Sequence, residues 1–126
     1  MLFFDYEGDP AQLPSLTLAY IGDAVYELYI RTQALERGNV RVQGLHKESV
    51  KMVNAKHQAK LLERIEGKLT EMELAVARRG RNAKSGHVPK NTEVTVYRRS
   101  TGFEALIGYL FLKREVNRIL ELLGED

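Results

Sequence analysis

The chain of 126 residues lacks cysteine and tryptophan altogether and has only three prolines. Without cysteine it can form no disulfide bond, no thiolate zinc site and no thiol nucleophile, so its chemistry must come from carboxylate, histidine, serine and backbone groups. Long hydrophobic runs are also lacking. The longest stretch without a charged residue, 10–22, falls well short of the roughly 20 residues that a membrane-spanning helix needs. No membrane association is expected.

The N-terminal segment carries acidic residues and has no basic region of the kind that opens a secretory signal, so the cytoplasm is the expected compartment. Hydrophobic residues make up 44% of the chain and charged residues 29%, which is typical of a globular protein. A chain of this length buries roughly two thirds of its unfolded surface. We therefore expect a single domain over residues 1–126, with an irregular N-terminal segment over 1–14.

Charge is unevenly distributed along the chain, although the formal net charge is only +2. Residues 77–100 contain seven basic side chains and one acid, a local net charge of +6, which leaves the rest of the chain near −4. Such a block, taken alone, is more often a solvated loop than a binding site. Its sign nevertheless suits an anionic partner, and nucleic acid is the obvious one.

Helix-forming residues dominate the chain, and no alternating strand pattern competes with them. The first helix is predicted over residues 16–37, with Ser15 as the N-cap and Gly38 as the C′ stop. Its first half is apolar on nearly every side. We therefore expect this helix to be central and buried.

The remainder of the chain is predicted to be helical too, which gives an all-α fold of six or seven helices. Apolar residues at mixed spacings of three and four indicate one or two amphipathic helices over residues 45–66. Thr70 and Glu73 form a capping box that opens a helix running to Gly80 or slightly beyond. A loop follows, with Gly80 and Gly86 as its predicted hinges, and the C-terminal part is helical again.

Two of the apolar helices each carry a carboxylate close to a glycine: Asp23 beside Gly22, and Glu104 one turn before Gly108. Glycine costs about 1 kcal/mol relative to alanine inside a helix. In return, its missing side chain allows two backbones to approach closely. The pattern therefore predicts that the two helices cross at these glycines and bring Asp23 and Glu104 together.

Two carboxylates in a partly buried site repel each other unless a proton or a cation lies between them. Magnesium suits such a pair, because Mg²⁺ prefers oxygen ligands, keeps several waters and binds substrate phosphate. With residues 77–100 holding a polyanion nearby, the pair points to metal-assisted hydrolysis of a phosphodiester.

Other interpretations of these residues stay open. Asp23 could instead form a buried ion pair with an arginine such as Arg98 or Arg99. Glu27 suits the rim of a site or an ion pair better than a metal ligand. The three histidines show no metal-ligand spacing and are expected to be structural or exposed: His46, His57 and His87.

The segments YIGDAV and FEALIGYLFL, which contain Asp23 and Glu104, resemble the two signature segments of the ribonuclease III catalytic domain and occur in the same order. Over essentially the whole chain, the sequence is most similar to the compact bacterial form of that family, Mini-ribonuclease III, which lacks a double-stranded-RNA-binding domain. The segments that carry this similarity include LAYIGDAVYELYIR, LHKESVKMVNAKHQA and RRGRNAKSGHVPKNTEVTVYRRST.

The resemblance implies an all-α homodimer with the ribonuclease III endonuclease-domain fold, which hydrolyses double-stranded RNA and leaves 5′-phosphate and 3′-hydroxyl ends. It makes Asp23 and Glu104 the catalytic carboxylates and metal ligands, with Mg²⁺ as the cofactor and Mn²⁺ as a substitute. The implied biological role is maturation of the large-subunit ribosomal RNA precursor. Affinity for a duplex stem of that precursor would come from this domain alone.

Four positions depart from the family pattern, each lacking an expected acid: Leu16, Ala19, Lys56 and Thr101. A metal site with many carboxylates is therefore not expected. We infer one well-held Mg²⁺ per site with more water in its coordination shell, and any second ion held chiefly by RNA.

The resemblance and the basic block together suggest which residues meet the partners. Tyr20 stands where the family places an aromatic residue that inserts into the other subunit, and Ala19 adds no buried charge there, so both are expected at the dimer interface. The expected RNA-binding residues are Arg78, Arg79, Arg81, Asn82, Lys84, Lys90, Arg98 and Arg99.

A rival hypothesis is a catalytically inactive helical module that only binds ribosomal RNA, the lost acids marking a dead site. Retention of both Asp23 and Glu104 favours the enzyme, because a pure binder has no reason to keep two carboxylates close to a polyanion. A DNA-binding protein is less favoured, since no helix has its residues set out as in a recognition helix.

Overall fold

The structure is a computed structural model that describes residues 5–83, 88, 90 and 93–124. In these residues it is all-α, as expected, with six α-helices and two short 3₁₀ helices. No helix among them is long and apolar enough to cross a membrane. The elements are η1 (Pro10–Gln12), α1 (Ser15–Glu36), α2 (Val42–Val53), α3 (Ala55–Ile65), η2 (Glu66–Lys68), α4 (Glu71–Asn82), α5 (Val94–Leu112) and α6 (Val116–Leu123).

The helix boundaries follow local capping chemistry. Gly38 ends α1 with φ +98°, the left-handed conformation that favours glycine. The region 45–66 divides into two helices at Asn54, whose side chain accepts a hydrogen bond from His57 N at 2.8 Å and so caps α3. The capping box of Thr70 and Glu73 is confirmed. The predicted N-cap of α1 is wrong, because Pro14 is the N-cap and Ser15 is already helical.

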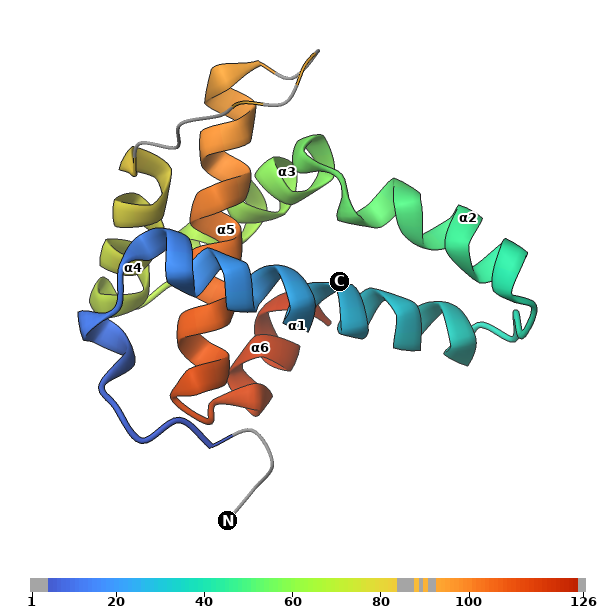
Figure 1. The fold of residues 1–126 in the computed structure, drawn as a ribbon, viewed down its shortest axis with the longest axis horizontal. Coiled ribbons are helices and arrows are strands. Elements are labelled where there is room, and N and C mark those ends of the chain that lie inside the picture. The colour runs from blue at the N-terminus through green and yellow to red at the C-terminus, as the bar shows by residue number, and fades with distance from the viewer. Residues whose placement is uncertain (1–4, 84–87, 89, 91–92, 125–126) are drawn as a thin grey trace.

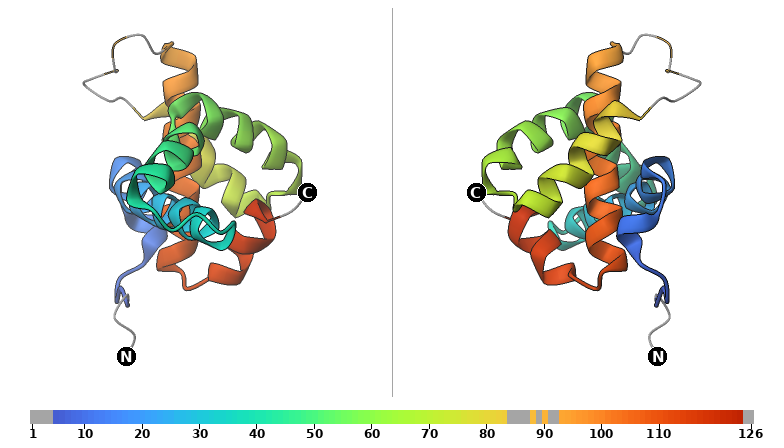
Figure 2. Two further views of the ribbon diagram at one scale, coloured as in Figure 1. Left: turned by 90° about the vertical axis from the view of Figure 1, so that its right-hand side faces the viewer. Right: turned by 90° about the vertical axis from the view of Figure 1, so that its left-hand side faces the viewer.

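Helix α5 is the centre of the molecule. Figure 1 shows it running vertically, with α1 crossing in front of it and α4 and α3 on either side. The contacts confirm this arrangement, since α1, α4 and α3 each pack mainly against α5. Figure 2 shows the same central position from the two sides. Ten consecutive or near-consecutive residues of α5, from Ser100 to Leu110, are buried as a result.

Helices α1 and α5 cross at two glycines, as the sequence predicted. A Cβ atom on Gly22 would lie 1.7 Å from the carbonyl oxygen of Glu104, and one on Gly108 would lie 2.0 Å from the carbonyl oxygen of Leu18. Real Cβ contacts are never that short, so any side chain at either position would force the helices apart. The close approach therefore depends on glycine in both helices.

A second crossing of the same kind joins α4 to α5. A Cβ on Gly80 would lie 2.9 Å from both Ala105 Cβ and Gly102 Cα, and one on Gly102 would lie 2.6 Å from the carbonyl oxygen of Ala77. Gly80 is therefore a buried packing residue within α4 and not the hinge predicted from the sequence. Gly86, the other predicted hinge, lies outside the described residues.

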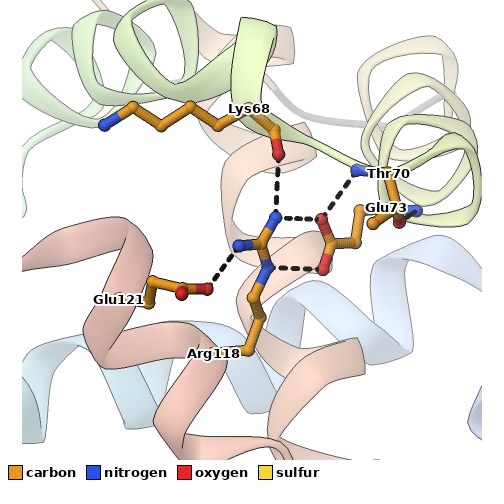
Figure 3. Close-up of polar contacts among 5 residues, drawn as sticks. All are labelled: Lys68, Thr70, Glu73, Arg118 and Glu121. Atoms are coloured by element: carbon orange, nitrogen blue, oxygen red, sulfur yellow. Dashed lines mark hydrogen bonds and ion pairs between the residues drawn. The ribbon is translucent and has the colours of Figure 1, made fainter.

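Helix α6 is attached to the start of α4 by a polar cluster around Arg118 (Figure 3). Its guanidinium donates two hydrogen bonds of 2.8 Å to the Glu73 carboxylate and one of 2.8 Å to the carbonyl oxygen of Lys68. A further bond reaches Glu121. The Glu73 side chain is only 6% exposed, and the bonds from Arg118 hold the pKa of its carboxyl below the usual 4.5 despite this burial.

Removing Arg118 should strongly destabilise the fold, because the Glu73 charge would stay buried without its partner. We expect Arg118→Leu to lower the free energy of unfolding by about 3 kcal/mol at pH 7 in urea titrations. Since the folded pKa of Glu73 is depressed, its contribution is complete above about pH 4.5 and disappears as pH falls below that. The gap between wild type and variant should therefore narrow in acid.

A surface ion pair provides the control. Arg31 pairs with Glu27 one turn away on α1, and its side chain is 64% exposed. Arg31→Leu should change the free energy of unfolding by about 0.5 kcal/mol or less. Equal losses in the two variants would show that the Arg118 cluster contributes no more than a surface pair.

Candidate active site

The crossing of α1 and α5 brings Asp23 and Glu104 together. Asp23 follows Gly22 on α1, and Glu104 is the residue whose carbonyl oxygen faces Gly22 from α5. The two carboxyl groups lie close enough that Asp23 adds to the rise that burial causes in the pKa of Glu104. Asp23 is solvent-exposed and Glu104 is half-buried, so Asp23 is not the buried acid that one of the open alternatives required.

The carboxylates of Asp23 and Glu104 repel each other, and among the described residues no positive charge offsets this repulsion in the raised pKa of Glu104. Burial, and then the neighbouring Asp23, raise the pKa of Glu104 from 4.5 to about 8. At neutral pH the metal-free pair therefore keeps a proton on Glu104. A divalent cation bound between the two carboxylates could replace this proton as the positive charge that offsets their repulsion.

The donor atoms fit a hard cation with few protein ligands. Two carboxylates at one edge of a helix crossing suit Mg²⁺, which commonly uses one or two carboxylates and keeps several waters. The described ranges contain no cluster of three or more histidine, aspartate and glutamate side chains that could enclose a metal. Because Asp23 is exposed, the pair is open to a substrate from the solvent side.

A third polar side chain meets the pair, and the sequence analysis missed it. Gln58 of α3 lies against Glu104, where its amide acts against the upward shift of that pKa. It is only 2% exposed. A signal was available, because Gln58 shares one helix face with the buried residues Leu61, Leu62 and Ile65, and a polar residue in that stripe is unusual.

The positions that lack a family acid have other roles. Leu16 is exposed, Ala19 lies in the core, and Lys56 is exposed at the start of α3. Thr101 is buried, and its hydroxyl donates to the carbonyl oxygen of Tyr97 at 3.0 Å within its own helix. The Thr101 hydroxyl therefore has a hydrogen-bond partner within its own helix.

The basic residues divide between α4 and α5. Arg81, Asn82 and Arg98 line one shallow pocket between the end of α4 and the start of α5. Arg99 pairs with Glu63 at 3.5 Å. Among the described residues Asp23 forms no ion pair, so the proposed pairing of Asp23 with Arg98 or Arg99 is wrong.

The other predicted RNA-binding residues that the structure describes do not line this pocket. Arg78 and Lys90 are exposed. Arg79 donates a long bond of 3.5 Å to the carbonyl oxygen of Ala11, and Arg81 lies 4.0 Å from Glu66. Lys84 falls outside the described residues.

The predicted dimer residues differ in exposure. Tyr20 is 78% exposed, whereas Ala19 is 7% exposed and belongs to the chain's own hydrophobic core. Ala19 therefore has little surface to offer a partner.

The two histidines within the described ranges show no sign of a metal site. His46 is exposed. Burial, and then the charges of Arg64 and Lys60, lower the pKa of His57. His87 lies outside the described residues.

Comparison with known proteins identifies the family of this chain. The sequence model of the Ribonuclease III domain matches residues 16–115. A Mini-ribonuclease 3 of Symbiobacterium thermophilum is 50% identical over 115 residues, which cover 91% of this chain and 88% of that protein. One of a Thermoanaerobacter species is 53% identical over 111 residues, which cover 88% and 78%. A crystal structure of a Fusobacterium nucleatum protein has a TM-score of 0.81 at 31% identity, covering 90% of each chain.

The chain therefore belongs to the ribonuclease III family and is an endoribonuclease. Within the family it is similar throughout to proteins named Mini-ribonuclease 3. The family acts on double-stranded RNA and generally depends on a divalent metal ion. A carboxylate pair, together with arginines on the helix that carries Glu104, is consistent with both properties.

Neutralising Glu104 should stabilise the metal-free protein. A carboxyl whose pKa is raised on folding makes the folded state less stable as pH rises from about 4.5 to about 8. Glu104→Gln lacks this effect, so without metal its melting temperature should exceed that of wild type by several degrees at pH 8.5 and approach it at pH 5. Glu36→Gln, at an exposed position, is the control and should follow wild type. A lower melting temperature for Glu104→Gln at pH 8.5 would contradict the repulsion described above.

Proposed function

We propose that this protein is a Mg²⁺-dependent endoribonuclease that hydrolyses double-stranded RNA and takes part in maturing the large-subunit ribosomal RNA precursor, with Mn²⁺ as a substitute ion. The products would carry 5′-phosphate and 3′-hydroxyl ends. The observation that carries the proposal is the meeting of Asp23 and Glu104 at the glycine crossing of α1 and α5. An rRNA-processing role would place the enzyme in the cytoplasm.

The two carboxylates would bind the cation from different sides, because Asp23 is exposed and Glu104 is half-buried. Asp23, on the solvent side, would hold the cation where an RNA phosphate can reach it, and Glu104 would hold it from the protein side. When bound, Mg²⁺ would supply Lewis acidity to the scissile phosphodiester and to the attacking water. In the absence of the four further family acids, waters would complete the coordination shell.

The RNA would lie across the ends of α4 and α5. Arg81, Asn82 and Arg98 line a common pocket there, and Arg78 is exposed on the same helix as Arg81. Guanidinium and amide groups contact phosphate and sugar without reading sequence, which suits a duplex recognised by shape. The salt bridges of Arg81 and Arg99 with Glu66 and Glu63 are exposed and weak enough to exchange for phosphate.

An inactive RNA-binding module is the alternative. It would share the basic surface but would gain nothing from a carboxylate pair whose charges repel each other and the RNA. The raised pKa of Glu104 therefore favours the enzyme, because such a perturbation is common at catalytic sites.

Asp23→Asn should abolish cleavage while leaving the fold intact. The amide keeps the shape of the side chain but loses the charge that attracts the cation, and Asp23 is exposed, so folding should not suffer. We expect at least a 100-fold lower rate on a radiolabelled duplex RNA with Mg²⁺, by denaturing gel, as for loss of a principal electrostatic group.

Two controls accompany that assay. EDTA should stop wild-type cleavage, and Asp23→Asn should bind the duplex at least as tightly as wild type, since it presents one negative charge fewer. Full Mg²⁺-dependent activity in Asp23→Asn would refute the metal site. Binding without cleavage in wild type would support the inactive module.

The exposed face of α1 supports a homodimer. Leu16, Tyr20, Ala24 and Leu28 recur every fourth residue along α1 and are all exposed. Residues at this spacing form a stripe, and an apolar stripe of this length on a surface is typical of an interface. Two active sites related by a two-fold axis would then face the two strands of a duplex. Asp23 directly precedes Ala24 of the stripe, so the dimer interface would lie close to both sites.

Tyr20→Asp should convert the dimer to a monomer, because an ionised side chain would have to enter a desolvated interface. By light scattering, wild type should have a mass of about 29 kDa, twice the 14.4 kDa of the chain, and the variant that of one chain. The variant should also lose double-strand cutting. Met72→Asp, at a residue 52% exposed on α4, is the control and should remain a dimer. A fully active wild-type monomer would overturn the proposal.

A further inference from the structure

We propose that Gln58 is a positioning residue of the carboxylate pair, whose side-chain amide donates a hydrogen bond that orients the Glu104 carboxylate toward a divalent cation. This inference rests on the proposed function and assigns a role to a residue on a third helix. The site would then be built from α1, α5 and α3 together.

The first argument is that Gln58 is buried at a position where an apolar residue would otherwise be expected. The buried polar side chains of the described chain are Ser49, Gln58, Glu73, Ser100 and Thr101. Glu73 is bonded to Arg118, and the hydroxyls of Ser100 and Thr101 donate to the carbonyl oxygen of Tyr97. Gln58 Nε2 and Ser49 Oγ have no hydrogen-bond partner. A buried amide nitrogen without a partner lowers the stability of the fold. A functional role would explain why Gln58 occupies this position.

The second argument is that the amide lies near Glu104. Helix α3 packs against α5, and Gln58 lies close enough to Glu104 to favour its ionised form. Even so, Nε2 does not reach a hydrogen bond of ordinary length and angle. Hydrogen bonds in ligand-free active sites are often long and tighten only when the site is loaded. The buried Nε2 of Gln58, which has no hydrogen-bond partner and lies near Glu104, fits this description.

The third argument comes from metal-site chemistry. A carboxylate ligand has two oxygens, and in most sites the carboxylate is held by a hydrogen bond from a neighbouring group. Asp23 cannot provide one to Glu104 when both are ionised, because a carboxylate is acceptor-only. Gln58 is the neutral donor beside Glu104, and its burial prevents water from competing for the bond.

The experiment compares two variants that each remove an unpartnered buried polar group. Gln58→Met keeps the length of the side chain and removes the amide, and Ser49→Ala removes a hydroxyl from α2, outside the carboxylate pair. Three quantities are measured on each full-length protein: the melting temperature without metal, the Kd for Mn²⁺ by calorimetry, and the cleavage rate of duplex RNA with Mg²⁺. Gln58→Leu is measured alongside Gln58→Met as a second variant that lacks the amide.

We expect both variants to melt at or above the wild-type temperature without metal. Gln58→Met should weaken Mn²⁺ binding by about 10- to 100-fold, the usual effect of removing such a partner, and should slow cleavage. Raising the metal concentration should restore part of its rate. Ser49→Ala should leave both the Kd and the rate unchanged.

Two results would overturn the role of Gln58 while leaving the proposed function intact. One is a Gln58→Met protein whose Mn²⁺ affinity and cleavage stay within twofold of wild type. The other is a loss of affinity that accompanies a lower metal-free melting temperature in both Gln58 variants, which would make the residue structural. A wild-type protein that binds no Mn²⁺ and cleaves no duplex would instead overturn the proposed function itself.

Discussion

The close approach of α1 and α5 at Gly22 and Gly108 is the constraint on which the rest of the structure depends. Each glycine faces a backbone carbonyl of the other helix at a distance that no side chain would allow. The crossing places Asp23 beside Glu104 and leaves the remaining faces of α5 to α3 and α4, the latter through a second glycine crossing. Packing and candidate chemistry therefore arise from one contact, and a change that separated the helices would affect both.

The packing of α1 on α5 holds Asp23 and Glu104 together although their carboxylates repel each other. An exposed carboxylate, Asp23, and a half-buried one, Glu104, are brought within interaction distance, and the cost appears as the raised pKa of Glu104. The stabilising polar cluster around Arg118 lies elsewhere, between α6 and the start of α4 (Figure 3). This separation lets the candidate active site carry unsatisfied groups, including the amide of Gln58, without loosening the ends of the bundle.

Much of this was predictable from the sequence, because the relevant signals are local or are paired along the chain. Helical periodicity, the capping box of Thr70 and Glu73 and the C′ glycine at position 38 depend on neighbouring residues only. The pairing of Asp23 with Glu104 followed from two apolar helices that each carried a glycine and an acid. One local prediction was wrong: the N-cap of α1 is Pro14, whose ring fixes its φ angle, and Ser15 is the first residue of the helix.

The tertiary structure alone decided which face of each helix is covered. A helix apolar on nearly every side does not reveal which stripe meets the core. The sequence therefore left a buried ion pair open for Asp23, which is exposed, and placed Ala19, which lies in the core, at an interface. Gly80 looked like a hinge because its partner, Gly102, is distant in sequence. Gln58 became a candidate only when α3 was placed against α5. The sequence by itself determined the helices and the carboxylate pair, whereas burial and the third helix of the site depend on contacts between segments far apart in the chain, which no local pattern encodes.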